Sequence, residues 1–149
     1  MSGSLDRGRL WRLGAAAGAL ATVINLAIFA AARAAGVTFT VPIYTGEVTP
    51  LPWAAVVTFT VVPFVLGLVL TTLVAGRAPG RLRAMQIVAV VVGVVSLQPP
   101  LTVAADGTTR ALLALMHLPP VVSFVLALQR LRAAGTAPPV ARETVSGQH

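Results

Sequence analysis

Residues 53–75 read WAAVVTFTVVPFVLGLVLTTLVA, a stretch that contains no charged residue. An α-helix of about 20 apolar residues is long enough to cross the roughly 30 Å of hydrocarbon in a bilayer. Inside the membrane the backbone N–H and C=O groups find no water, so a spanning segment has to satisfy them within a helix. The sequence therefore predicts a transmembrane helix over residues 53–75.

Three similar stretches predict further spans at about residues 13–32, 84–104 and 111–128. The whole chain of 149 residues is 56% hydrophobic and only 10% charged, whereas globular proteins are about 25% charged. The first stretch is too long for a secretory signal, whose apolar region has about 7–15 residues. We therefore predict an all-α fold, a four-transmembrane-helix bundle over residues 13–132. A cytoplasmic N-terminal segment, 1–12, and a disordered cytoplasmic tail, 133–149, complete the predicted organisation.

The positions of the arginines predict the orientation of the bundle. Of the 11 basic residues, all arginine, only Arg33 and Arg110 lie on the side of the 36–52 loop. The others lie on the opposite side: Arg7, Arg9, Arg12, Arg77, Arg81, Arg83, Arg130, Arg132 and Arg142. Because basic residues are retained on the cytoplasmic side, both termini are expected there. The arginine-only, alanine-rich composition favours a bacterial protein, and hence the bacterial cytoplasmic membrane.

The net charge of +7 could indicate a nucleic-acid partner in a soluble protein. Here the charges lie next to predicted spans, so topology explains them better. The expected partner is the lipid bilayer, including anionic lipids at Arg77, Arg81 and Arg83.

Small residues recur at helical spacing within three of the spans. Such stripes let transmembrane helices approach closely, so we expect them to mark helix-packing faces. They include Gly14, Gly18 and Ala21 in the first span, Gly67 in the second and Gly93 in the third.

Prolines predict irregular helices. Only some 14 residues, about 21 Å, precede Pro99 in the third span, which therefore has to kink or unwind at Gln98-Pro99-Pro100. In the loop before residue 53, Val37, Phe39, Val41 and Ile43 alternate with other residues, a pattern typical of a short extended segment. Residues 61–68 and 121–128 are alike at six of eight positions, which leaves open two parallel helix-hairpin repeats.

Five polar residues are expected in the outer half of the membrane: Asn25, Thr58, Thr60, Gln98 and His117. Intramembrane polar residues of this kind are candidates for a ligand pocket. The alternative is structural, because each proline leaves a carbonyl without its helical N–H, and these side chains could donate to such carbonyls. Both interpretations remain open at this stage.

No complete catalytic or metal-binding set is found in the sequence. The predicted spans contain one histidine, no cysteine and no carboxylate, whereas a zinc site takes three or four ligands. We therefore expect no enzyme activity, no bound metal and no cofactor.

Two short motifs carry a resemblance to a known family. They are Val23-Ile24-Asn25-Leu26-Ala27-Ile28, which precedes Arg33, and Leu115-Met116-His117-Leu118. Over roughly residues 10–132 the chain resembles a family of small four-helix bacterial, actinobacterial-type membrane proteins with no assigned function. The resemblance implies the same topology and no particular activity.

Two functions fit these observations. The first is an accessory or structural membrane bundle that acts through contacts, as a homo-oligomer or with another membrane protein. The second is a small-molecule or lipid binding or transport protein whose polar pocket surrounds His117 in the outer half of the membrane.

Overall fold

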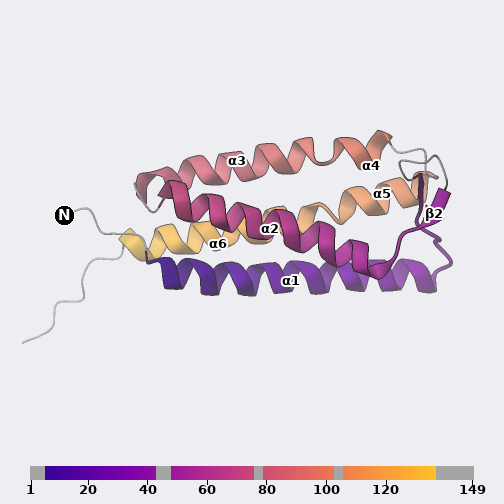
Figure 1. The fold of residues 1–149 in the computed structure, drawn as a ribbon, viewed down its shortest axis with the longest axis horizontal. Coiled ribbons are helices and arrows are strands. Elements are labelled where there is room, and N and C mark those ends of the chain that lie inside the picture. The colour runs from indigo at the N-terminus through magenta and orange to yellow at the C-terminus, as the bar shows by residue number, and fades with distance from the viewer. Residues whose placement is uncertain (1–5, 43–47, 76–78, 103–105, 137–149) are drawn as a thin grey trace, which may run out of the picture.

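The computed structural model describes residues 6–42, 48–75, 79–102 and 106–136, which form four long helices lying side by side (Figure 1). The first two are continuous, α1 (Arg7–Ala34) and α2 (Trp53–Ala75). The third consists of α3 (Leu82–Val95) and α4 (Gln98–Thr102), and the fourth of α5 (Gly107–Leu115) and α6 (Leu118–Thr136). All four are long and apolar enough to cross a membrane, so the helical fold and the number of candidate spans are confirmed.

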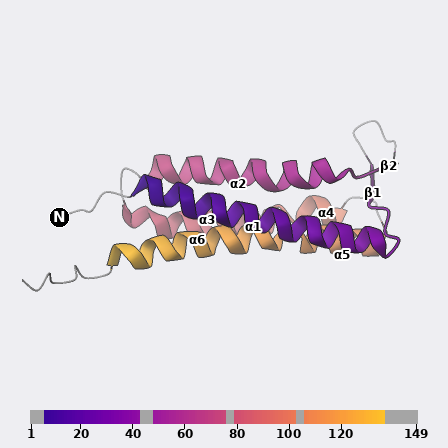
Figure 2. The same ribbon diagram turned by 90° about the horizontal axis from the view of Figure 1, so that it is seen from below.

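The chain runs up and down along the bundle. Helix α1 begins and α6 ends at one end, where the short 3-10 helix η1 (Pro79–Arg81) also precedes α3 (Figure 2). We call this the termini end. At the other end, the hairpin end, two short strands follow α1, and α4 is succeeded by α5.

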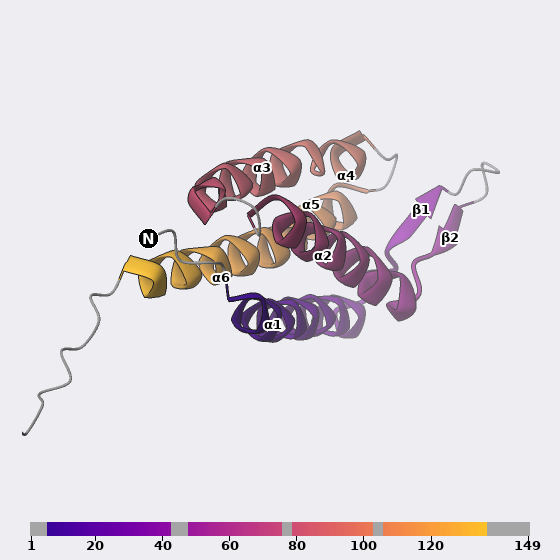
Figure 3. The ribbon, with the colours of Figure 1, turned by 60° about the vertical axis from the view of Figure 1, so that its left-hand side comes forward.

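Helix α1 lies against both α2 and α6, whereas α3 packs chiefly on α6 and has few contacts with α2 (Figure 3). The third helix is therefore attached mainly through the fourth. It exposes a large part of its surface to the surroundings of the bundle, since Val88, Val91, Val92 and Val95 are all exposed.

Helices α1, α3, α5 and α6 extend beyond the predicted spans, α1 and α6 by the most residues. Helix α1 starts at Arg7, where the Asp6 carboxylate caps it by accepting a hydrogen bond of 2.9 Å from the Arg9 N–H. Helix α6 continues to Thr136, so residues 133–136 of the predicted tail are helical. The remainder of that tail, 137–149, and residues 1–5 of the predicted N-terminal segment lie outside the described residues.

Strands β1 (Thr40–Pro42) and β2 (Val48–Pro50) pair in antiparallel fashion, with Val41 opposite Thr49. The predicted extended segment is thus confirmed at residues 40–42 only, since Val37 and Phe39 lie outside the strand and Ile43 lies outside the described residues. Phe39 precedes β1 with a φ of 51°, a left-handed conformation that is unusual for a large side chain. Its ring is fully buried and lies 4.9 Å from that of Phe29, centroid to centroid.

The predicted break in the third helix is confirmed. Helix α3 ends at Val95, and the N–H of Leu97 donates to the Val94 carbonyl over 3.1 Å instead of continuing the α-helical ladder. The fourth helix is broken in the same way before its own proline pair. There the N–H of His117 donates to the Ala114 carbonyl over 3.1 Å, and α6 begins at Leu118. Each proline pair thus lies in the first turn of a new helix, where proline is tolerated.

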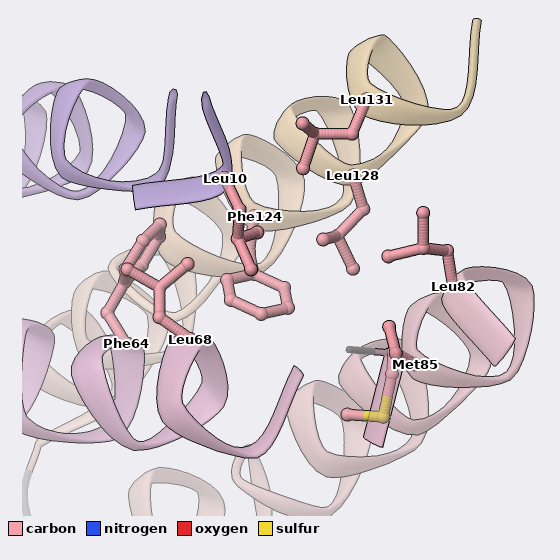
Figure 4. Packing of buried hydrophobic residues seen from close by; sticks show 9 residues of the cluster. Leu10, Phe64, Leu68, Leu82, Met85, Phe124, Leu128 and Leu131 are labelled. Carbon is pink, nitrogen blue, oxygen red and sulfur yellow. The ribbon is translucent and has the colours of Figure 1, made fainter. Parts of the chain in front are cut away.

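Apolar side chains fill the interior as two clusters. The cluster toward the termini end is shown in Figure 4 and consists of Leu10, Phe64, Leu68, Ala75, Leu82, Met85, Phe124, Leu128 and Leu131. Within it the rings of Phe64 and Phe124 pack edge to face with centroids 5.2 Å apart. These two phenylalanines occupy equivalent positions in the proposed repeat, which itself stays a prediction. The second cluster contains Phe29, Ala32, Phe39, Val56 and Met116.

Candidate functional site

A group of buried polar atoms joins α1, α2 and the break in the fourth helix. Asn25 is 2% exposed, and its Nδ2 donates hydrogen bonds of 2.9 Å to the Thr60 hydroxyl and of 2.9 Å to the Met116 carbonyl. The Thr60 hydroxyl in turn donates to the Val56 carbonyl on its own helix over 2.8 Å. We call Asn25, Thr60 and the Met116 carbonyl the polar junction.

The proline pair of the fourth helix explains why Asn25 is bonded to this carbonyl. In an unbroken helix the carbonyl of Met116 would accept from the N–H of residue 120, but Pro120 has none. A buried carbonyl without a donor is costly in an apolar environment. The Asn25 amide supplies the missing hydrogen bond from a neighbouring helix.

His117 has a local partner. Its ring Nδ1 lies 2.7 Å from the Leu113 carbonyl, one turn earlier on the same helix. A carbonyl oxygen can only accept, so Nδ1 carries a proton in this contact. In a regular helix the backbone N–H of His117 would donate to the Leu113 carbonyl, but here it donates to the Ala114 carbonyl. The ring takes its place as the donor to Leu113. His117 is therefore engaged with the break in its own helix.

One atom of the junction is not paired. Within the described residues, Oδ1 of Asn25 is buried and has no hydrogen-bond partner. An unsatisfied buried acceptor costs about 1–3 kcal/mol, which offsets part of the gain from the two bonds of Nδ2.

The other two residues predicted for an outer pocket lie elsewhere. Thr58 and Gln98 are exposed. Thr58 is two residues from Thr60, which turns it about 200° round α2 and away from the junction. Of the five candidates, Asn25 and Thr60 meet directly, His117 follows Met116 in the chain, and Thr58 and Gln98 face outward.

Two surface clefts are formed by other residues. The larger, about 670 Å³, lies at the hairpin end, and we call it the hairpin-end cleft. It is lined by Leu26, Phe29, Ala30, Arg33, Pro50, Leu51, Pro52 and Trp53. The smaller, about 250 Å³, runs between α3 and α6, and we call it the α3–α6 groove. It is lined by Gln86, Ile87, Val90, Val91, Val125 and Gln129. None of the five predicted pocket residues lines either cleft.

The small residues predicted to pack helices lie inside the bundle. Gly14 faces Leu68 and Gly18 faces the ring of Phe64, both across the α1–α2 contact. On the other helices, Gly67 faces the Phe124 ring and Gly93 faces Val121. Ala21 is fully buried. These positions are therefore occupied by contacts within one chain.

Gln86 is a buried polar residue that the sequence analysis did not single out. Its Nε2 donates to the Val125 carbonyl over 3.3 Å, and its Oε1 accepts a hydrogen bond of 2.7 Å from Nη1 of Arg132. The signal in the sequence was the position of Gln86, a carboxamide one turn after Arg83 at the start of an apolar helix. Nothing in the sequence indicated that Arg132, 46 residues later, would reach it.

Metal ligands are not gathered in the described part of the chain, where no group of three or more His, Cys, Asp or Glu side chains could hold an ion. The junction is instead a set of amide, hydroxyl and carbonyl groups, which can stabilise a helix contact or bind a polar group.

Comparison with known proteins gives one match. No curated protein and no solved structure matches the chain. A family model described as a family of unknown function does match, over residues 5–134, which is most of the chain and all four helices. The chain therefore belongs to the family of unknown function DUF6069.

Proposed function

We propose that this protein is a non-enzymatic, multi-pass protein of the bacterial cytoplasmic membrane that acts by packing α1 against a transmembrane helix of a second copy or of another protein. The observation that carries the proposal is the composition of the exposed face of α1. Its small exposed residues are Ala15, Ala16, Ala19, Ala27, Ala30, Ala31 and Ala34.

These alanines form a stripe along the helix. Positions 16, 19, 23, 27, 30 and 34 are separated by steps of three or four, so their side chains lie on one face, which carries alanine at every position except Val23. Leu20 and Ile24 are also exposed on α1, but the exposed surfaces of α2 and α3 carry more large residues, such as Phe59, Leu66 and Val94. Alanine covers little lipid-facing surface and lets a second backbone come close, which is how transmembrane helices associate.

The contacts inside the bundle support this assignment. The glycine faces of α1, α2 and α3 already meet Leu68, Phe64, Phe124 and Val121, so they are not available for a partner. The alanine face is the small-residue surface that the fold leaves uncovered.

Orientation forms part of the proposal. Arg7, Arg9, Arg130 and Arg132 lie at the termini end, which favours placing that end in the cytoplasm. Arg81 and Arg83 are exposed at the same end and are proposed to contact anionic lipid headgroups together with Arg77, which lies outside the described residues.

The absence of enzyme activity is supported by the bonding of the His117 ring to its own helix.

The oligomeric state tests the proposal. In detergent or nanodiscs, the wild-type protein should run as a homo-oligomer or with a co-purified membrane protein. Ala19→Leu and Ala27→Leu add bulk to the stripe without disturbing a helix in lipid, and should each reduce that association. Val94→Leu adds bulk to an exposed position of α3 and is the control. A wild-type protein that is strictly monomeric and co-purifies with no membrane protein contradicts the proposal.

A second candidate function, binding of a small amphiphilic molecule, is favoured by the hairpin-end cleft. It combines the aromatic side chains of Phe29 and Trp53 with the Arg33 guanidinium, whose Nη1 donates to the Thr38 carbonyl over 3.2 Å. If this function is correct, Trp53→Ala should abolish ligand binding without changing helicity, whereas His117→Ala should leave binding intact.

A further inference from the structure

The α3–α6 groove changes from apolar to charged along its length. On α3, Val90 and Val91 lie toward the middle of the bundle, followed by Ile87 and Gln86, and then by Arg83 at the termini end. Arg83 and Ile87 are four residues apart and therefore lie on the same face of the helix. The distance from Arg83 to Val91 along the axis is about 12 Å.

The facing helix α6 repeats this order. Val125 lies toward the middle, Gln129 is one turn closer to the termini end, and Arg132 follows after three more residues. Both walls thus run from aliphatic side chains through a carboxamide to a guanidinium, in the same direction.

A hydrogen bond fixes the charged end of the groove. Nη1 of Arg132 donates to Oε1 of Gln86, a bond of 2.7 Å between the two walls. Gln86 is 8% exposed and also donates to the Val125 carbonyl, so it is held on both sides. Leu82, Met85, Leu128 and Leu131, from the same two helices, belong to the apolar cluster that Figure 4 shows. The guanidinium of Arg132 is therefore positioned at the mouth of the groove by a buried residue.

We propose that the α3–α6 groove binds one anionic phospholipid of the cytoplasmic leaflet. An acyl chain lies along Val90, Val91 and Val125, the Gln129 amide faces the ester region, and the phosphate lies at Arg132 and Arg83. Guanidinium groups suit phosphate because they present several N–H donors in a fixed plane. The proposal depends on the cytoplasmic placement of the termini end and is independent of the α1 contact.

The dimensions and charges of the groove suit an anionic lipid. Its volume of about 250 Å³ is open to the surroundings of the bundle and suits part of a single acyl chain. The described residues that line it include no carboxylate, so nothing in the lining opposes an anionic headgroup at the arginine end. An anionic lipid complements that end in charge, and a zwitterionic lipid does so less well.

Native mass spectrometry of protein released from nanodiscs of equimolar phosphatidylglycerol and phosphatidylcholine tests the proposal. The wild-type protein should retain one phosphatidylglycerol in preference to phosphatidylcholine. Arg132→Ala should reduce retention roughly tenfold, the effect of losing one charge-assisted hydrogen bond. Arg130→Ala removes the same charge two residues away and leaves the bond between Arg132 and Gln86 in place, so it should have little effect.

A second pair of variants tests the apolar part of the groove without changing charge. Val91→Phe fills the groove and should reduce phosphatidylglycerol retention, whereas Val92→Phe places the same ring on the adjacent exposed position and should not. Both valines are exposed, so neither variant is expected to disturb folding, which far-ultraviolet circular dichroism checks.

Three results would overturn the proposal. They are equal retention of the two lipids, equal effects of the two arginine variants, and a change of oligomeric state instead of lipid retention in Val91→Phe. Ala27→Leu should leave lipid retention unchanged. The same mass spectra report both the bound lipid and the oligomeric state, so they distinguish failure of the lipid proposal from failure of the α1 packing proposal.

Discussion

The side-chain amide of Asn25 on α1 donates a hydrogen bond of 2.9 Å to the Met116 carbonyl, the acceptor that Pro120 leaves without a helical donor. The bond joins residues 91 positions apart and links the first helix to the break in the fourth. In a membrane, where no water can satisfy that carbonyl, it stabilises the irregular backbone as well as the helix contact.

Removal of this amide should destabilise the bundle, and the size of the effect should depend on Pro120. Asn25→Leu is expected to cost about 1 kcal/mol of unfolding free energy, a usual value for a polar contact between transmembrane helices. In a Pro120→Ala background the N–H of residue 120 can donate to Met116, so the same substitution should cost less. A double-mutant cycle measured by unfolding in mixed micelles checks this coupling.

Thr22→Val provides the control for Asn25. The Thr22 hydroxyl donates only to the Gly18 carbonyl of its own helix, so its loss should change stability little. If the costs of Asn25→Leu and Pro120→Ala simply add, the carbonyl does not depend on the amide and this explanation of the junction is incorrect.

Two glycine contacts should differ in their tolerance of alanine. A Cβ on Gly93 would lie 2.5 Å from Cγ2 of Val121, a short β-branched side chain that cannot turn away. A Cβ on Gly14 would meet the methyl ends of Leu68, which can change rotamer. Gly93→Ala should therefore destabilise by about 1–3 kcal/mol, as overpacking does, and Gly14→Ala by less. Thermal unfolding of the two variants in one detergent gives the order, and the reverse order would contradict the packing described.

Phe39 combines an unfavourable backbone with a favourable side chain. Its φ of 51° costs about 1–2 kcal/mol, which glycine would not incur. Loss of the buried ring costs about 3–5 kcal/mol. The expected order of stability is wild type, then Phe39→Gly, then Phe39→Ala, because alanine loses the ring and keeps the strain. Equal stability of the glycine and alanine variants would show that the left-handed conformation is not retained.

The Asp106 carboxyl should titrate at lower pH than usual. The Thr109 hydroxyl, which donates to Oδ2 over 2.7 Å, lowers its pKa, and the Thr109 N–H, which donates to Oδ1 over 2.9 Å, lowers it further. A lowered pKa in the folded state means that the α5 cap is fully stabilising above about pH 4 and weakens as the pH falls through the folded-state pKa. An NMR titration should show the pKa of Asp106 rising toward its ordinary value in Thr109→Val. An unchanged pKa would contradict the assigned cause.

Much of the fold follows from the sequence because the bilayer limits what a chain can do. Long uncharged stretches have few alternatives to helices, and Pro99-Pro100 breaks the third helix where its missing donors require it. The break at Met116 and His117 lies just before Pro119-Pro120, whose missing N–H groups leave carbonyls without helical donors, but the length of the span alone did not locate it.

The site was less predictable, since it depends on how each helix is rotated. The sequence indicated that Asn25 and the threonines could donate to carbonyls freed by proline, but it did not identify Met116 as the acceptor of Asn25. Thr58 and Gln98 were predicted for the pocket on the same grounds as Thr60, but both residues are exposed. The contact between Gln86 and Arg132 depends on the packing of α3 on α6, which hydropathy does not encode.

Single-cysteine accessibility in intact cells tests the central claim, that four helices cross the membrane with the termini end in the cytoplasm. The chain has no cysteine of its own, and Gly8, Gly80 and Gly107 have room for a side chain. A membrane-impermeant maleimide should label Gly107→Cys from outside the cell and should label Gly8→Cys and Gly80→Cys only after lysis. Labelling of Gly8→Cys from outside, or equal labelling of Gly80→Cys and Gly107→Cys, would contradict the account.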